Sequence, residues 1–176
     1  LPWMGIEKSK LVNEAVADIK AATKMGELYD LIITNNPTFA TDEDKKHALN
    51  MFFAQLLFCL FAEDTGLFDD DIFTNTIATY SDDDGSDLKT VLSNIFRSLD
   101  SKDKSNFPAY CKDLPYVGGD LFTGNIDLPI FSRKARANII EAGKLDWYEI
   151  NPDIFGSMIQ VISSPEERGS LAEHFT

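Results

Sequence analysis

The fold is decided by residues 48–62, ALNMFFAQLLFCLFA, which are apolar on nearly every side of the helix that they predict. A helix that is apolar all round lies either at the centre of a soluble core or across a membrane. The run is shorter than the roughly 17–25 apolar residues that a membrane span requires, and Asn50 and Gln55 interrupt it. The sequence therefore predicts a buried core helix.

The two ends of this helix carry local signals. Residues 41–44, Thr-Asp-Glu-Asp, resemble a capping box, in which the Thr41 hydroxyl accepts a hydrogen bond from a free backbone N–H. The carboxylates also complement the positive end of the helix dipole. Gly66 is expected to close the helix in a left-handed conformation, followed by the hydrophobic contact of Leu67 and Phe68.

Apolar residues at steps of three and four predict amphipathic helices on both sides of the core helix. The first runs from about Ile6 to Asn35, and Asn36-Pro37 ends it because a residue before proline avoids the helical region. Four further helices are expected to start at Asp69-Asp70-Asp71, at Ser86 or Asp87, at Ser132 (running to Ala142), and at Asn151-Pro152-Asp153.

The stretch from Ser101 to Ile130 has a different character. Prolines and glycines punctuate it, yet it retains apolar residues, so it predicts a long connection anchored on the core. Two short strands are expected in it, around Leu121-Phe122 and Leu128-Pro129-Ile130. The predicted fold class is mainly α: a single helical domain with a long Pro/Gly-rich connection and two short strands.

Composition restricts the function classes. An apolar fraction of 44% and 13 Phe residues indicate a folded domain, and a net charge of −13 disfavours unaided binding to phosphate backbones. Two cysteines, Cys59 and Cys111, make no disulfide scaffold, so a cytoplasmic location is expected. The start at Leu1 shows no signal peptide, and with the end at Thr176 it suggests a piece of a longer protein.

Several motifs invite a catalytic or metal-binding interpretation. Residues 151–154, Asn-Pro-Asp-Ile, lack the second proline of the amino-methyltransferase motif, and Phe155 stands one place late, so a helix cap explains them better. Residues 82–87 resemble a calcium loop, but Ser93 stands where the loop needs a glutamate, which favours a solvated turn. His47 has no second ligand at zinc spacing, and no metal site is expected.

Two groups of charged residues remain as candidates. Glu63 and Asp64 end the buried helix, where a structural role is favoured over a remote alternative, a small hydrolase that uses both carboxylates. Arg133, Lys134, Arg136 and Lys144 form the local basic cluster; they are candidate contacts to a DNA backbone, and the alternative is an ordinary solvated helix face.

Three longer strings carry a family resemblance. Residues 56–68 (LLFCLFAEDTGLF), 145–156 (LDWYEINPDIFG) and 164–176 (SPEERGSLAEHFT) are similar to the region upstream of the methyltransferase domain in large single-chain restriction–modification enzymes. These are adenine-specific DNA methyltransferases of the type II G/L kind. Their order is an optional nuclease, a helical spacer, an S-adenosylmethionine-dependent methyltransferase and a target-recognition domain.

The resemblance implies that residues 1–163 are the spacer domain and that residues 164–176 are the junction into a methyltransferase domain. His174, Phe175 and Thr176 match the step that begins the cofactor-side segment in the family, although Phe175 stands where Tyr is common. S-adenosylmethionine is implied for the longer protein, at the edge of which these three residues would lie. No cofactor is expected in the present chain.

The expected function is a non-catalytic scaffold that orients catalytic modules. Its expected partners are the downstream methyltransferase and target-recognition domains, and DNA through the longer protein, with no membrane. A second hypothesis is a stand-alone protein–protein interaction module whose apolar loop from Tyr110 to Phe131 docks a partner. The length of the native reading frame would discriminate the two.

Overall fold

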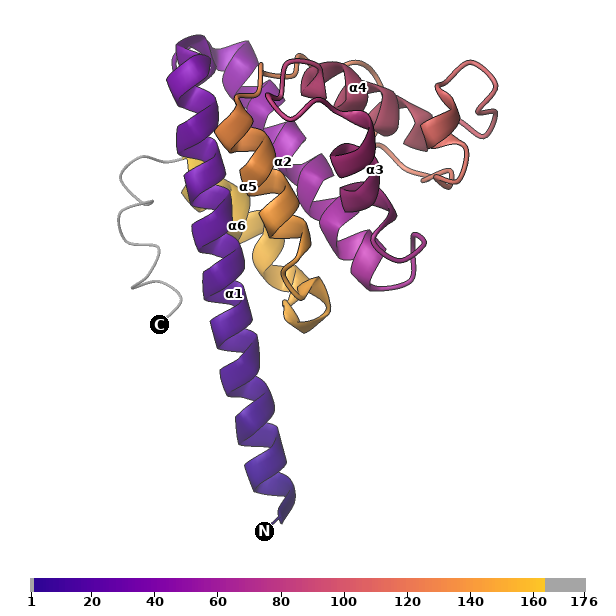
Figure 1. Cartoon of the computed structure of the whole chain (residues 1–176). Helices are drawn as coiled ribbons and strands as arrows, with labels where there is room; N and C mark the ends of the chain where they lie inside the picture. The colour runs from indigo at the N-terminus through magenta and orange to yellow at the C-terminus, as the bar shows by residue number, and fades with distance from the viewer. Residues whose placement is uncertain (1, 164–176) are drawn as a thin grey trace.

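The structure, a computed structural model, describes residues 2–163, with side chains from Val16 to Gln160 apart from Met158. Within that range it confirms the mainly α fold class (Figure 1). The α-helices are α1 (Pro2–Asn35), α2 (Glu43–Asp64), α3 (Ile72–Tyr80), α4 (Leu88–Leu99), α5 (Arg133–Gly143) and α6 (Phe155–Ser163). Short 3-10 turns lie at η1 (Pro37–Ala40), η2 (Ala109–Cys111), η3 (Trp147–Glu149) and η4 (Pro152–Ile154).

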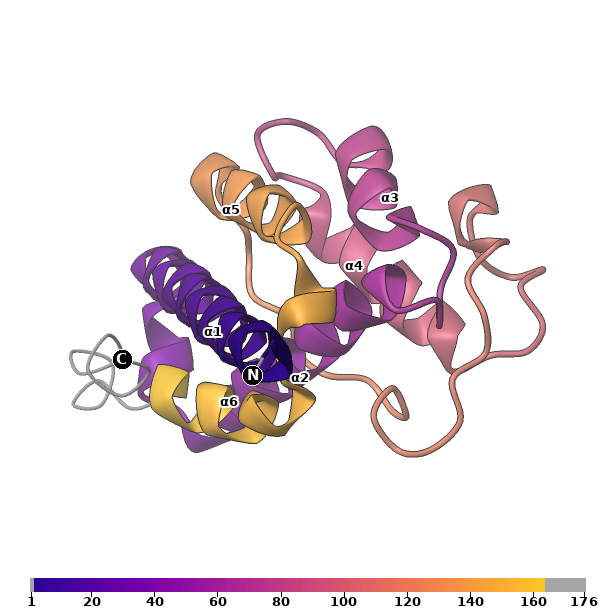
Figure 2. The same cartoon turned by 90° about the horizontal axis from the view of Figure 1, so that it is seen from below.

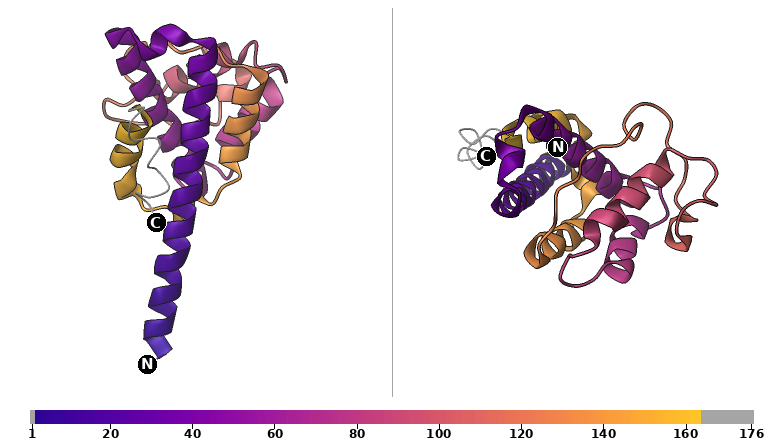
Figure 3. Two further views of the ribbon diagram at one scale, coloured as in Figure 1. Left: turned by 90° about the vertical axis from the view of Figure 1, so that its left-hand side faces the viewer. Right: turned by 90° about the horizontal axis from the view of Figure 1, so that it is seen from above.

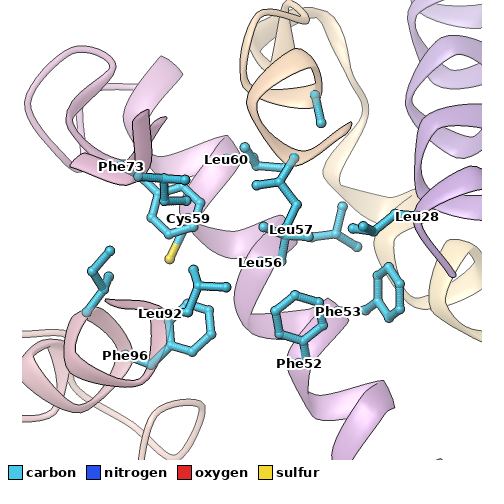
Figure 4. Close-up of a cluster of buried hydrophobic side chains, with 14 of the residues drawn as sticks. Leu28, Phe52, Phe53, Leu56, Leu57, Cys59, Leu60, Phe73, Leu92 and Phe96 are labelled. Carbon is cyan, nitrogen blue, oxygen red and sulfur yellow. The ribbon is translucent and has the colours of Figure 1, made fainter. Parts of the chain in front are cut away.

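Helix α2 is the central element, as its apolar sequence predicts. Its Phe52, Leu56 and Leu60 side chains are completely buried. Figure 4 shows the α2 side chains between Phe73 of α3 and Phe96 of α4 on one side and Leu28 of α1 on the other. The rings of Phe73 and Phe96 stack with their centroids 6.4 Å apart. Elements on both sides of α2 thus share one core.

Helix α1 lies along α5 and also packs against α6. Its core-facing side chains, Ala21, Met25, Leu28 and Ile32, follow the predicted helical spacing and are fully buried. The N-terminal part of α1 extends well beyond the rest of the molecule, which is clearest in the left view of Figure 3. Of the described helices, none has the length and apolarity to cross a bilayer.

The predicted left-handed glycine after the end of α2 is confirmed, whereas the predicted N-terminal cap of α2 is wrong. Gly66 adopts the expected left-handed conformation, with φ of +83°. At the N-terminus, however, the capping residue is Asp42, whose carboxylate accepts a 3.0 Å hydrogen bond from the backbone N–H of Lys45. Thr41 ends the preceding 3-10 turn, so its hydroxyl lies beside the carbonyl of Thr38 and does not cap the helix.

The two expected strands do not form in the described residues. At Leu121, the backbone carbonyl accepts a 2.9 Å hydrogen bond from the Gln55 side chain of α2. At Ile130, the carbonyl accepts from the Asn36 side-chain amide at 2.8 Å and the N–H donates back to it at 2.9 Å. The prediction of strands was wrong because side-chain amides of distant residues take up the backbone groups that a sheet would use.

Helices α3 and α5 approach each other closely at Gly143, the last residue of α5. A Cβ atom added at Gly143 would overlap the side chain of Thr74 on α3. Only a glycine allows this distance between the two helices, so Gly143 determines how near α5 lies to α3.

Gly143→Ala is expected to lower the free energy of unfolding by about 1–3 kcal/mol, because the added methyl group must displace Thr74 or the backbone of α5. Urea unfolding followed by circular dichroism measures this. The matched control is Gly156→Ala in α6, where an added Cβ meets nothing within 4 Å. The control should be neutral or stabilising, since alanine favours helix by about 1 kcal/mol over glycine. Equal stability of the two variants would contradict the close α3–α5 contact.

Candidate functional site

The carboxylates that end α2 connect it to two other elements. Glu63 is only 1% exposed. One of its oxygens accepts a 2.8 Å hydrogen bond from the backbone N–H of Thr74, and the other accepts from the Thr74 hydroxyl. The adjacent Asp64 accepts a 2.9 Å hydrogen bond from the backbone N–H of Trp147 in η3. The two acids therefore hold the start of α3 and the η3 turn against the end of α2.

Burial changes the acidity of both groups. Desolvation raises the pKa of Glu63 from 4.5 to about 7; the hydrogen bonds from Thr74 oppose this rise, and the charges of Asp64 and Asp71 add to it. Desolvation also raises the pKa of Asp64, against the hydrogen bond from Trp147. A carboxyl group with a pKa near 7 suits general acid–base catalysis. Here, however, both oxygens of Glu63 are bonded to Thr74, which favours the structural role.

A groove lies directly beside these acids, between α3 and the end of α5. We call it the α3–α5 groove; its volume is about 740 Å³. Ala78, Ile140 and Leu145 give it apolar walls, while Asp64, Asp71 and Asp146 contribute carboxylates. Lys144 is the cation among its lining residues. In the described part of the chain, no group of three or more His, Cys, Asp or Glu residues could hold a metal ion.

The predicted basic cluster is divided by the fold. Arg133 and Lys134 are exposed at the start of α5, which begins within one residue of the predicted position. The Ser132 hydroxyl caps this helix by accepting a 3.1 Å hydrogen bond from the N–H of Ala135. Lys144 is exposed just after the other end of α5, about 16 Å away along the helix axis. The structure thus leaves three exposed basic residues of the cluster, two at the start of α5 and one just after its end.

Arg136 has a different environment, since it is only 8% exposed. Its guanidinium donates to the Ser81 hydroxyl at 2.8 Å and to the Ala78 and Ser81 carbonyls at 3.1 and 3.3 Å. It also lies 3.6 Å from the Asp83 carboxylate. Arg136 therefore satisfies the carbonyls at the end of α3. Sequence reasoning missed this role, because the partners lie more than 50 positions upstream.

The other motifs have structural explanations. The Asn151 side chain accepts a 3.0 Å hydrogen bond from the N–H of Asp153, as expected of a cap. In the acidic turn at residues 82–87, Asp87 occupies the N-cap position of α4, one of the two positions predicted for it. Its carboxylate makes no capping hydrogen bond and instead accepts a 2.7 Å hydrogen bond from the N–H of Asp82. His174, Phe175 and Thr176, with the rest of the predicted junction at 164–176, lie outside the described residues.

The long connection turns most of its apolar anchors inward. Its buried residues are Cys111, Leu114, Phe122, Leu128 and Phe131. Tyr116 and Ile130 remain 47% and 62% exposed. The loop from Tyr110 to Phe131 therefore contributes mainly to the domain's own core and offers little apolar surface to a partner.

Comparison with known proteins gives three matches. Residues 47–122 match the family model described as "MmeI, helicase spacer domain". The whole chain is 44% identical over 177 residues to part of DNA methyltransferase A of Bacillus subtilis (strain 168). A solved structure of the Type IIL restriction-modification enzyme MmeI in complex with DNA superposes with a TM-score of 0.71 and 35% identity over 85% of this chain. The chain spans about a fifth of the length of each of these two relatives.

Glu63→Gln is expected to remove one component of the pH dependence of stability. The unfolded carboxyl group ionises near pH 4.5, whereas the folded one ionises near pH 7. The folded state therefore holds the extra proton in this window, and the wild-type free energy of unfolding should fall as the pH rises from about 4.5 to 7. The variant, which has no ionisable group at this position, should lack this component.

Urea unfolding of both proteins between pH 5 and pH 8 measures the difference. The wild type should lose stability relative to Glu63→Gln as the pH rises. The exposed Glu43, replaced by glutamine, serves as the matched control and should leave the wild-type profile in place. A constant difference between wild type and Glu63→Gln over the whole range would show that the buried carboxyl group has no raised pKa.

Proposed function

The chain resembles the helical spacer region of MmeI-like restriction–modification enzymes in both sequence and fold, and from this premise we propose that it connects and orients the modules of a site-specific DNA adenine methyltransferase. In this proposal the longer protein uses S-adenosylmethionine in the cytoplasm, and residues 164–176 lead into its methyltransferase domain. The chain itself contributes no catalytic group.

The observation that carries the proposal is the agreement with the MmeI structure over 85% of this chain, which occupies only 20% of that enzyme. The arrangement of the acids is consistent with it. The most strongly perturbed carboxyl group, Glu63, has both of its oxygens occupied by hydrogen bonds to Thr74, and Asp64 holds the η3 turn. The perturbed acids support the fold, as expected of a scaffold.

The charge of the chain also supports a connecting role. A net charge of −13 opposes DNA binding by the body of the domain, so basic modules elsewhere in the longer protein must hold the duplex. The exposed Arg133 and Lys134 could then contact phosphates of a duplex that these modules bring close to the start of α5. Lys144, the third exposed residue of the predicted basic cluster, lines the α3–α5 groove beside three carboxylates, which oppose the approach of phosphates there. Arg136 is bonded to α3 and takes no part in this proposed contact. His174, Phe175 and Thr176 would border the cofactor site of the longer protein.

The isolated chain is expected neither to methylate DNA nor to bind S-adenosylmethionine measurably, because the proposal places the cofactor loop and the catalytic motif in other domains. Isothermal titration calorimetry with S-adenosylmethionine should give only the heat of dilution. The longer protein, titrated in the same way, is the positive control. Micromolar binding by the isolated chain would be incompatible with a purely connecting role.

In the longer protein, Arg133→Gln combined with Lys134→Gln should weaken binding to all DNA sequences alike. Loss of two phosphate contacts should make the slope of log Kobs against log salt concentration shallower by about 2. Fluorescence anisotropy at several salt concentrations measures the slope. The control, Lys102→Gln with Lys112→Gln, removes two exposed charges from the connection and should leave the slope unchanged. Unaltered slopes for both pairs would mean that α5 does not touch the duplex.

A further inference from the structure

The α3–α5 groove is a hollow of about 740 Å³ whose walls are fixed by buried contacts. Figure 2 shows α3 and α5 on the same side of the molecule. The Glu63 carboxylate accepts a hydrogen bond from the Thr74 backbone N–H, and the Thr74 side chain in turn lies against Gly143 of α5. Because these contacts determine the distance between the two helices, the groove exists before any partner binds. A preformed groove needs little further ordering when it is occupied.

The carboxylates of the groove lack compensating cations. Among the described residues, no ion pair within 4 Å joins Asp64, Asp71 or Asp146 to a lysine or arginine. Lys144 also lines the groove, but it pairs with none of them. After desolvation, the charges of Asp71 and Asp146 are among the factors that raise the pKa of Asp64. Three acids therefore line one groove without an ion-pair partner, and the charges of Asp71 and Asp146 act on Asp64.

The apolar walls of the α3–α5 groove indicate which kind of side chain fits into it. Ala78, Ile140 and Leu145 offer a surface for an aliphatic chain, next to the carboxylates that would receive a cation. A lysine side chain combines these two properties, since its methylene stem packs on apolar surface while its ammonium group bonds to carboxylates. The groove is thus complementary in shape and charge to a segment that carries lysines.

The source of such a segment follows from charge balance. The solved relative binds DNA, and a protein that binds DNA neutralises phosphates with lysine and arginine. This chain carries a charge of −13, so the basic surface must belong to the neighbouring modules. Attraction between the acidic chain and a basic module would bring the two together and favour one orientation.

We propose that the α3–α5 groove is the docking site for a lysine-bearing segment of a basic neighbouring module, whose ammonium groups pair with Asp71 and Asp146. The proposal rests on the proposed function, because it assumes that the chain is joined to such modules. It adds the surface by which their relative orientation is maintained.

Zero-length cross-linking of the longer protein with a carbodiimide, followed by mass spectrometry, tests this directly, because the reagent joins only carboxylates and amines that are in contact. We expect cross-links from Asp71 or Asp146 to lysines outside residues 1–176. In the variant Asp71→Asn with Asp146→Asn, these cross-links should disappear. Both side chains are exposed, and although the two residues occupy the N-cap positions of α3 and η3, neither carboxylate makes a capping hydrogen bond, so the variant should fold. The control, Asp113→Asn with Asp120→Asn, should leave the cross-links unchanged.

Hydrogen exchange on the same proteins gives a second measurement. The turn from Lys144 to Trp147 should exchange faster in the groove variant than in the wild type and in the control. Cross-links from Asp71 and Asp146 only to lysines within this chain, together with unchanged exchange, would overturn the docking proposal. If other faces of the chain still cross-link to outside lysines, the connecting function stands without the groove. If no residue of this chain cross-links outside residues 1–176, the connecting function fails as well.

Discussion

Burial of the apolar side chains of α2 is the constraint on which the rest of the structure depends. Fully burying one large apolar side chain contributes roughly 1.5–3 kcal/mol, and from Ala48 onward α2 buries such side chains around more than half of its circumference, including Phe52, Phe53 and Leu57. A helix with only one apolar stripe needs one neighbour, whereas α2 needs a neighbour on each side. Helices α6 and α3 pack against α2, Tyr29 of α1 and Phe96 of α4 make ring contacts with it, and the long connection bonds to its Gln55. The number and arrangement of the surrounding elements thus follow from one 22-residue helix.

The few polar residues of α2 determine where those neighbours lie. Apolar contacts are not directional, so they permit several positions of a neighbouring segment, but a buried polar group must find its hydrogen-bond partner. Gln55 therefore fixes the connection at Leu121, and Glu63 fixes the first turn of α3 at Thr74. Asn36, just beyond α1, does the same for Ile130. The apolar surface provides most of the stability, and these three polar residues specify one arrangement.

The same distinction explains what could be predicted from the sequence. Helices could be located because their apolar spacing is a local property: α4 begins, and α5 begins and ends, within about one residue of expectation. The strands were wrong because the decisive partner of Ile130 lies 94 positions away. The capping role of Arg136 depends likewise on Ser81, 55 positions away. The α3–α5 groove could not be predicted at all, since it arises where three separated segments meet.

Under the proposed function, helix α5 illustrates how an acidic domain would serve a DNA enzyme. Its first turn exposes Arg133 and Lys134, whereas its other end borders the carboxylates of the groove. Phosphates would be attracted to Arg133 and Lys134 at the start of α5 and repelled by the carboxylates of the groove at its end. A basic protein segment would be repelled at the start of α5 and attracted to the groove. One short helix therefore presents different surfaces to two different kinds of partner. Because the chain as a whole is strongly acidic, a duplex held by the proposed neighbouring modules would be repelled from most of it and would approach it closely only near the start of α5. Repulsion between the acidic surface and the phosphates would then help to orient the duplex, in addition to the contacts at the start of α5.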